Sequence, residues 1–263
     1  MTTISTAFQT SLDNLDDQIQ ELVNESLTHP AVRHPFLTRI AACGFRDNVA
    51  ALRQYAVEYS GYAQWFPRYL KGVISRLERD DHRELLSHNL EEEQGLLGED
   101  DRAELRKVGI NPDSVQNVAH PLLYRRFCDA MGVRTEELAE PSRAAARWRT
   151  RFLYFLEHAT PAQAVGALGL GTEHIVKPVY KQLLKGIIAM GVLRRDEFVF
   201  FELHCLVDDQ HQKDLLEIAR DLARAPGGIE ELRSGMRTAL QMRNEFWDDL
   251  YRNILDNQLA NPA

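Results

Sequence analysis

The chain has 263 residues, 44% of them hydrophobic and 27% charged, which is enough for one or two globular domains with a sizeable core. Its formal net charge of −8 argues against a surface that binds nucleic acid or an anionic membrane by charge alone. The three cysteines, Cys43, Cys128 and Cys205, are odd in number and lack CxxC spacing, which argues against a disulfide framework and a thiolate zinc site.

The N-terminal segment MTTISTAFQTSLDNLDDQIQ is acidic and lacks the basic region and the long apolar region of a secretory signal. No apolar stretch approaches the about 20 residues that a membrane-spanning helix needs. We therefore expect a cytoplasmic protein with no membrane and no nucleic-acid partner.

Helical periodicity dominates the chain, and no Val-, Ile- or Thr-rich alternation bounded by tight-turn pairs indicates a strand. The sequence therefore predicts an all-α fold. Pro67 is expected to kink or break the third helical region, and Asn111-Pro112-Asp113 is expected to begin a further helix. The expected helical regions are residues 9–26, 36–43, 47–78, 80–97, 120–131, 140–158, 162–190, 196–222 and 228–257.

Gly166, Gly169 and Gly171 fall inside one of these regions, where each glycine should weaken a helix. They indicate either a break or a close crossing of two helices, and Pro178 adds an expected kink. No connector exceeds about a dozen residues, so we interpret residues 1–263 as one domain.

The last helical region, 228–257, places large apolar side chains near one face. We expect this face to pack within the domain, with dimerisation as the alternative use. The side chains are those of Met236, Leu240, Trp247, Leu250 and Ile254.

A run of the form H-x3-D-x2-H lies in the helical region 196–222 and comprises His204, Asp208 and His211. On a helix, positions 0, +4 and +7 fall within about 60° of one another, so the three side chains point the same way. Imidazole and carboxylate together suit iron or another borderline transition metal, whereas Ca²⁺ and Mg²⁺ prefer oxygen ligands alone. The run predicts one face of a transition-metal site, with a chance arrangement as the alternative.

Further ligand-type residues stand on other helical backgrounds. The motif NLEEEQG offers three glutamates at residues 91–93, His120 lies in an apolar stretch before a proline, and Glu173 lies in a mostly uncharged run. Each also has an ordinary explanation: a solvated acidic face, a core or capping histidine, and an ion pair with Lys177. Carboxylates and imidazoles that converge from several helices on two irons would instead form an oxygen-activating centre.

Taken together and in order, these residues resemble the heme-oxygenase-like diiron oxidases and oxygenases, iron-containing redox enzymes that share their fold with thiaminase II and pyrroloquinoline-quinone synthase. The resemblance rests also on HPFLTRI (34–40), WFPRYL (65–70) and HPLLYRRFCDAMG (120–132). It implies a single-domain heme-oxygenase-like helical bundle of about seven to nine helices, with its core at about 28–220 and a C-terminal packing helix at about 228–257.

The resemblance also implies the iron ligands. The family pattern N-L-x-x-E-x-G selects Glu93 over its neighbours, and the closing motif selects Asp208 over Asp209, in agreement with the helix geometry. Two Fe(II) ions per chain would then have three carboxylates and three imidazoles as ligands, with one or two carboxylates bridging. The implied metal ligands are Glu93, His120, Glu173, His204, Asp208 and His211, and the implied catalytic carboxylates are Glu93, Glu173 and Asp208.

The spacer between two of these ligands is long. Twenty-six residues separate Glu93 from His120, and a spacer of this length resembles the N-oxygenase branch of the family. That branch carries an extra carboxylate ligand shortly before the histidine. Asp113 is the nearest candidate for it here, although the position of this residue at an expected helix start leaves the assignment open.

In the family, two ferrous ions and O₂, the co-substrate, give a peroxo-diferric intermediate that oxidises the substrate. The resemblance therefore implies oxidation of a small nitrogen-containing metabolite, such as an amino acid or an amine, in a biosynthetic pathway. N-oxygenation, C–C cleavage and desaturation are all open, and an external electron donor and a homodimer are compatible with each.

Two other functions are open. A metal-free relative of the same fold would act as a thiaminase II-like hydrolase or a cofactor-free oxidase. The hydrolase needs a nucleophilic cysteine beside a carboxylate, for which Cys128 and Cys205 are the helical candidates. A non-enzymatic helical module that binds a partner protein would present an exposed apolar stripe instead.

Overall fold

The computed structural model describes the backbone of residues 2–206 and 208–260, and the side chains of residues 14–206 and 210–260. These residues form helices, turns and loops and include no β-strand, which confirms the predicted all-α class. None of their helices is both long enough and apolar enough to cross a membrane.

Most of the described chain is α-helical, with a few 3₁₀ segments and one π segment. The α-helices are α1 (Thr2–Thr28), α2 (Pro35–Ala41), α3 (Asn48–Ala63), α4 (Phe66–Ile74), α5 (Asp80–Glu93), α6 (Glu99–Lys107), α7 (His120–Ala130), α8 (Thr135–Ala139), α9 (Arg143–His158), α10 (Pro161–Val165), α11 (His174–Met190), α12 (Val199–Leu206), α13 (Asp208–Ala223) and α14 (Gly228–Ala260). The 3₁₀ segments are η1 (Pro30–Val32), η2 (Pro112–Ser114) and η4 (Arg195–Glu197), and η3 (Gly166–Glu173) is a π-helix.

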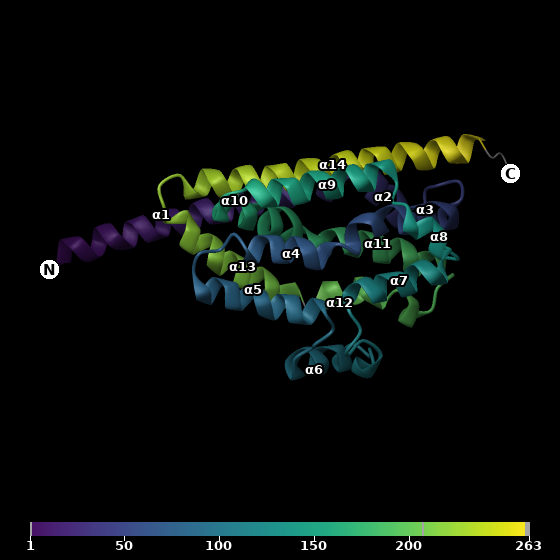
Figure 1. The fold of residues 1–263 in the computed structure, drawn as a ribbon, viewed down its shortest axis with the longest axis horizontal. Helices are drawn as coiled ribbons and strands as arrows, with labels where there is room; N and C mark the ends of the chain where they lie inside the picture. Colours follow the sequence, from purple (N-terminus) through teal and green to yellow (C-terminus); the bar gives the residue numbers. More distant parts are fainter. Residues whose placement is uncertain (1, 207, 261–263) are drawn as a thin grey trace.

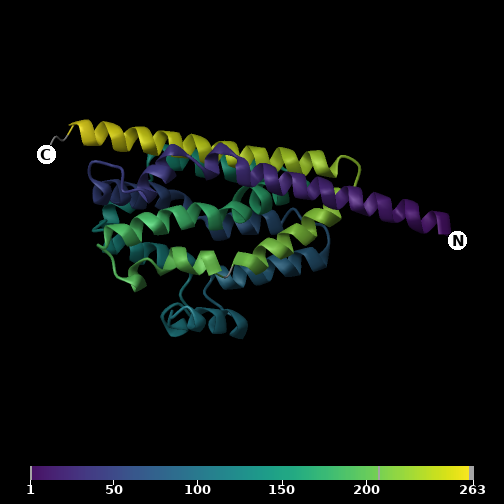
Figure 2. The ribbon, with the colours of Figure 1, turned by 180° about the vertical axis from the view of Figure 1, so that it is seen from behind.

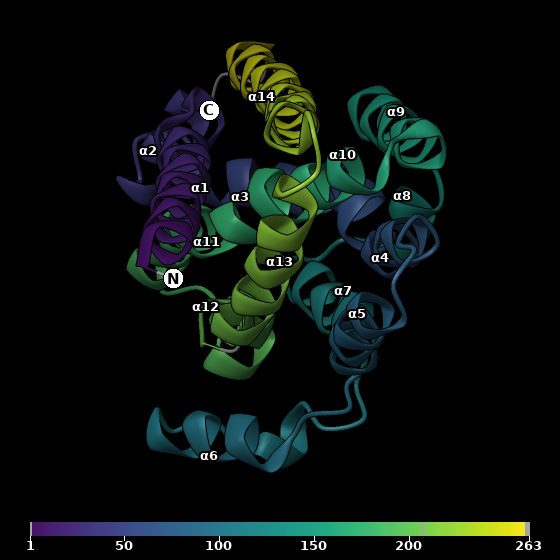
Figure 3. The ribbon, with the colours of Figure 1, turned by 90° about the vertical axis from the view of Figure 1, so that its left-hand side faces the viewer.

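The long helix α14 runs along one edge of the molecule, with α9 on one side of it and α1 on the other (Figures 1 and 2). In the view along the long axis, α5, α7 and α12 lie on the side away from α14, and α10 and α11 lie between (Figure 3). The short helix α6 projects from the edge opposite α14. The interior between these helices receives buried side chains from α3, α5, α7, α11, α12 and α14.

Aromatic side chains fill the interior beside α14. Tyr62 of α3 stacks on Trp148 of α9 with ring centroids 3.7 Å apart, and Tyr59 stacks on Trp247 of α14 at 5.8 Å. The five apolar residues expected on one face of the last helix are all at most 1% exposed. This burial confirms that the face packs within the chain.

The π-helix η3 and α14 cross at a separation that only glycine permits. A Cβ added to Gly166 would lie 2.1 Å from the carbonyl oxygen of Leu232, and one added to Gly171 would lie 2.8 Å from that of Met236. Any side chain at these positions would push the two helices apart. Of the two interpretations of the glycines, the close crossing is therefore confirmed, and it coincides with the wide π winding of η3.

Some expected helices differ from those observed. The expected region 47–78 is broken at Pro67, as predicted, because the proline occupies the first turn of α4 and separates it from α3. The helix expected at Asn111 is wrong, since only the 3₁₀ turn η2 forms and the chain then turns at Asn117 with a φ of 59°. More helices form than the seven to nine predicted, because α6 and α8 are additional short helices and three expected regions (47–78, 162–190 and 196–222) are each divided.

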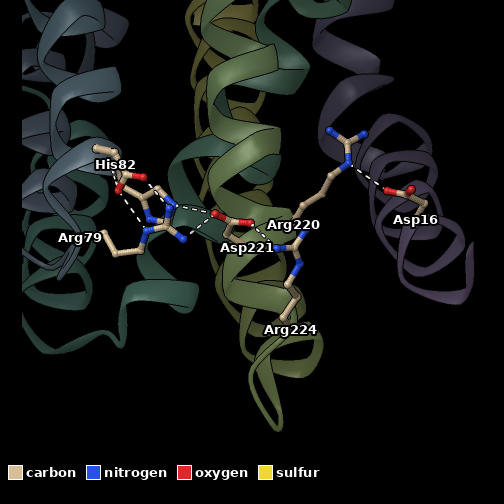
Figure 4. Close-up of polar contacts among 7 residues, drawn as sticks. Asp16, Arg79, His82, Arg220, Asp221 and Arg224 are labelled. Atoms are coloured by element: carbon tan, nitrogen blue, oxygen red, sulfur yellow. Dashed lines mark hydrogen bonds and ion pairs between the residues drawn. The ribbon is translucent and has the colours of Figure 1, made fainter. Parts of the chain in front are cut away.

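A polar cluster joins α5, α13 and α1 (Figure 4). The carboxylate of Asp221 on α13 accepts hydrogen bonds from Arg79 at 2.7 Å and from His82 at 3.2 Å. Beside it, Arg220 donates to Asp16 of α1 at 3.1 Å. Because His82 is only 4% exposed, Asp221 supplies the acceptor that its buried ring nitrogen needs.

Candidate metal centre

Four of the expected ligands come from four different helices and meet in the interior. Glu93 ends α5, His120 begins α7, Glu173 ends η3 and His204 lies on α12. All four side chains are buried. One ligand atom from each of Glu93, His120 and His204 lies within 4.8 Å of the other two, a spacing at which the three could hold one metal ion.

The long spacer between Glu93 and His120 starts and ends at the same place. The backbone N–H of Asn117 donates to the carbonyl of Gly95 at 2.8 Å. Gly95 has a φ of 91°, and a Cβ on it would lie 2.5 Å from the backbone nitrogen of Val118. The chain therefore leaves α5, forms α6 outside the bundle and returns beside its point of departure, which puts His120 next to Glu93.

Glu93 lies between two imidazoles. Its Oε1 is 3.0 Å from Nδ1 of His120 and 3.8 Å from Nε2 of His204, and the two rings are 4.7 Å apart. Burial works against a charge on Glu93, but His120, through its charge and a hydrogen bond, outweighs burial and holds the pKa of this carboxyl below its ordinary value. The carboxylate is therefore ionised at neutral pH, as a metal ligand has to be.

His204 is held in one tautomer. Its Nδ1 lies 2.7 Å from the carbonyl oxygen of Phe200, which can only accept, so Nδ1 carries the proton and Nε2 keeps a lone pair on the side of Glu93. Burial, together with the nearby His120, lowers the pKa of His204 to about 4, so the ring is neutral at pH 7. A hydrogen bond from the outer nitrogen to a carbonyl is typical of metal-binding histidines.

Several atoms of this cluster lack the partners that burial demands. Within the described part of the chain, neither ring nitrogen of His120 makes a hydrogen bond of normal geometry, and Oε1 of Glu173 makes none. Burial also raises the pKa of Glu173 to about 7. Imidazole nitrogens and carboxylate oxygens that meet without a hydrogen bond are stabilised by a cation between them. Two imidazoles and two carboxylates form a donor set that fits iron.

Two of the expected ligands belong to α13, and only one can be placed. His211 is buried, and its Nε2 lies 2.5 Å from Oε2 of Glu92, the neighbour of Glu93 on α5. Asp208 begins α13, but its side chain lies outside the part of the chain that the structure describes. The sequence analysis missed Glu92, because the family pattern N-L-x-x-E-x-G selects only Glu93 among the three glutamates.

Asp113, the candidate for an extra carboxylate ligand, lies on the surface. Its side chain is 77% exposed and lies 3.3 Å from the guanidinium of Arg102 on α6. Because no α-helix forms at this point, the residue stays on the outer part of the spacer, away from the buried cluster. Asp113 is therefore not a ligand in this structure.

A small cavity adjoins the cluster. Its volume is about 20 Å³, which is room for one water-sized molecule. The four clustered residues form part of its wall, and the rest is apolar or aromatic except for Thr172 and Arg243. Sequence reasoning also missed Arg243, although a lone arginine four residues before Trp247, on the apolar face of α14, was a signal for it. The aromatic wall residues are Tyr59, Tyr62, Phe66, Tyr180 and Phe200.

The chain is similar to known proteins in sequence and in fold. A family model described as an iron-containing redox enzyme matches residues 53–244. A 4-aminobenzoate synthase from Chlamydia muridarum is 27% identical over 217 residues, which cover 81% of this chain and 79% of that protein. A solved domain of unknown function with a heme oxygenase-like fold, from Shewanella denitrificans, has a TM-score of 0.68 at 16% identity over 96% of each chain. A TenA homologue from Pseudomonas syringae pv. tomato has a TM-score of 0.66 at 16% identity, over 89% of this chain and 92% of that one. These likenesses confirm the predicted heme-oxygenase-like fold.

Proposed function

Because the chain belongs to the family of iron-containing redox enzymes, we propose that it is a non-heme diiron oxidase or oxygenase with two ferrous ions per chain and O₂ as its co-substrate. The observation that carries this proposal is the buried cluster of Glu93, His120 and His204, with Glu173 beside it in the same cavity wall. A donor set of imidazoles and carboxylates in a closed, mostly apolar interior suits iron chemistry.

We assign these four residues as ligands and His211 and Asp208 as the remaining two. His211 is near enough to influence the pKa of both glutamates, Glu93 and Glu173, which supports its place in the set. Ferrous iron held by these side chains would supply the activation of O₂. The carboxylates would balance the charge of the metal ions.

The protein's own part is to orient the ligands and to exclude water. His204 donates from Nδ1 to the carbonyl of Phe200, which fixes the direction of its other nitrogen. Glu92 holds one nitrogen of His211 and so orients that ring. The aromatic wall of the cavity, which includes Tyr62 and Phe200, keeps bulk water away from the reacting groups.

The substrate that we propose is a small nitrogen-containing metabolite, oxidised by N-oxygenation, C–C cleavage or desaturation in a biosynthetic pathway. The similar protein from Chlamydia muridarum, 4-aminobenzoate synthase, is named for a product that is an aromatic acid with an amine. A cavity wall rich in aromatic rings suits such a compound. The external electron donor, the homodimer and the cytoplasmic location stay predictions.

The alternative, hydrolysis by a nucleophilic cysteine in a metal-free protein, has less support. Neither Cys128 nor Cys205 belongs to the described cavity wall. Burial raises the pKa of Cys128 to about 12, and a thiol with this pKa is not ionised at neutral pH. The likeness to a TenA homologue concerns the fold, which does not fix the chemistry.

Iron binding by variants of the cluster tests the proposal. The protein is purified without O₂, incubated with Fe(II) and freed of unbound metal, and its iron content per chain is measured. We expect about two ions per chain for the wild-type protein. His120→Ala and His204→Ala should each lose about half of this iron or more, with the helical circular dichroism retained.

His88→Ala is the matched control, because His88 lies on α5 with a side chain that is 66% exposed. This variant should bind iron as the wild-type protein does. A wild-type iron content near zero, or full iron content in both cluster variants, would contradict the proposed function.

A further inference from the structure

Arg243 of α14 is a buried cation in the wall of the cavity. It is 1% exposed, and it shares the cavity with Glu93, His120 and His204. Those three residues lie on α5, α7 and α12, which stand on the side of the molecule away from α14 (Figure 3). The cavity wall thus combines ligand-type side chains with a guanidinium, and Arg243 is near enough to act on the pKa of Glu173, the fourth of them.

The guanidinium of Arg243 interacts with the hydroxyl of Tyr59, but it makes no hydrogen bond of normal geometry with the described residues. Its Nε, Nη1 and Nη2 all lack a hydrogen-bond partner among the described residues. Its central carbon, Cζ, lies 5.4 Å from the ring centroid of Tyr62 and 5.0 Å from that of Trp148. These cation–π contacts hold the group in place but use none of its five N–H donors.

Such an arginine is unusual in a purely structural role. Burying a charge without hydrogen-bond acceptors is unfavourable, and arginine cannot relieve this by losing its proton. Even the partly exposed Arg53 has a carboxylate partner, since its Nη2 lies 2.8 Å from both oxygens of Glu137. An anion with two oxygens side by side would accept two parallel hydrogen bonds from the planar fork of Arg243.

We propose that Arg243 binds the carboxylate of the substrate, so that the substrate is a small carboxylic acid whose remaining part points toward the metal ligands. This inference rests on the proposed function, because that function supplies the reacting centre, and it narrows the substrate class. An amino acid or an aromatic amino acid such as an aminobenzoate fits, whereas a simple amine without a carboxylate does not.

The cavity is small, so its wall has to move before a carboxylic acid can enter. A volume of about 20 Å³ takes one water-sized molecule, so a carboxylic acid displaces at least one wall side chain. Phe66, at the start of α4, is half-buried, while the other described wall residues are buried. We therefore expect the acid to enter by displacing the side chain of Phe66.

Equilibrium binding of carboxylic acids to variants of Arg243 tests the inference. Acetate, benzoate and 4-aminobenzoate are titrated calorimetrically into the full-length protein, with and without Fe(II) and in the absence of O₂. Benzamide is the uncharged analogue of benzoate. Arg243→Met should weaken the binding of the acids about 30-fold, as expected for a charge-assisted bidentate contact, and leave benzamide binding unchanged.

Two further variants make the result specific. Arg243→Lys keeps the charge but loses the planar fork, so it should weaken the binding of the acids about fivefold to tenfold. If Arg243→Met does not fold, the result for Arg243→Lys tests the inference. Arg149→Met is the matched control. Arg149 also stacks on a tryptophan, 4.4 Å from the ring centroid of Trp65, but it lies outside the cavity wall, so this variant should bind as the wild-type protein does.

The outcomes separate this inference from the proposed function. Unchanged binding of the acids in both Arg243 variants, an equal loss for benzamide, or no binding of any of the three acids by the wild-type protein would overturn the inference. Iron is counted on the same samples. Loss of acid binding in the Arg243 variants with full iron content supports the inference. Acid binding through Arg243 in a protein that takes up no iron after incubation with Fe(II) would contradict the proposed function alone.

Discussion

Glu93 and Glu173 carry the same side chain in the wall of the same cavity, yet their surroundings move their pKa values in opposite directions. Burial opposes the charge of both, but His120 beside Glu93 outweighs it and holds that pKa below its ordinary value. For Glu173 burial dominates and raises the pKa to about 7. Glu173 is therefore the member of the cluster whose charge is least favourable in the metal-free protein.

Replacing Glu173 should change how the stability of the metal-free protein depends on pH. A carboxyl whose pKa rises from 4.5 to about 7 on folding stabilises the folded state fully below pH 4.5, and this contribution is lost as the pH rises through 7. We expect Glu173→Gln to match the wild-type protein at pH 5 and to exceed its unfolding free energy by about 2–3 kcal/mol at pH 8. Urea unfolding at the two pH values measures this, and an equal difference at both would contradict it.

Residue type and spacing alone left an ordinary explanation open for each of Glu93, His120 and Glu173. The resemblance to the heme-oxygenase-like diiron enzymes was needed to predict these residues and His204 as neighbours. The partner of His211 was not predictable, because three consecutive glutamates do not reveal which carboxylates turn inward at the end of a helix. A single arginine on an apolar face equally suits a side chain that reaches out to water. Only the packing of α14 against the cavity shows that this arginine points inward and does not reach out to water.

Between helices, the spacer shows how a long insertion leaves a buried site intact. The carbonyl of Gly95 accepts a hydrogen bond from Asn117, so the two ends of the spacer are fastened to each other and α6 stays outside the bundle (Figure 1). The positions of Glu93 and His120 then depend on this contact and not on the conformation of the spacer. The sequence shows the length of the insertion but not the contact that closes it.

A side chain at Gly95 should therefore weaken iron binding, although Gly95 is not a ligand. Its Cβ would lie 2.5 Å from the backbone of Val118, so Gly95→Ala displaces the start of α7 and His120 with it. We expect a loss of iron affinity of about tenfold, measured by competition with a chelator. Gly132→Ala is the control, since Gly132 also has a positive φ, 70°, but has no atom within 4 Å of an added Cβ. Equal losses in both variants would show that backbone strain, and not the position of His120, is responsible.

Proline and glycine marked several element boundaries correctly, and the exceptions have physical reasons. Pro67 breaks its helix because the proline ring fits only the first turn of α4. The proline after Asn111 is equally compatible with a single 3₁₀ turn, which is what forms. The π winding of η3 could not be predicted, because it accompanies contacts with Leu232 and Met236, more than sixty residues further along the chain.

For the whole molecule, an all-α fold followed from the helical periodicity and from the lack of alternating apolar residues. Periodicity did not choose among helical bundles, since the packing order of helices depends on contacts between distant segments. The heme-oxygenase-like arrangement was expected from family motifs instead. The cluster around Asp221 is such a distant contact, because it joins residues of α5 and α13 that lie about 140 positions apart (Figure 4).

This cluster should contribute measurably to the stability of the molecule. Asp221→Ala removes the acceptor of the buried His82 and of Arg79, so we expect a loss of about 1–3 kcal/mol in unfolding free energy, measured by urea denaturation. Asp16→Ala removes the neighbouring exposed pair with Arg220 and should cost less than about 0.5 kcal/mol. A smaller loss for Asp221→Ala than for Asp16→Ala would contradict the assignment of Asp221 as a structural link.

The location of iron is the most direct test of the central claim. Crystals of the protein loaded with Fe(II) without O₂ can be measured at the iron absorption edge, and the anomalous difference map places the metal independently of any assumed ligand. We predict two peaks in the interior, beside the side chains of Glu93, His120, Glu173 and His204, with His211 next to one of them. A map without a peak at these residues, or with iron only on the surface, would contradict the diiron assignment.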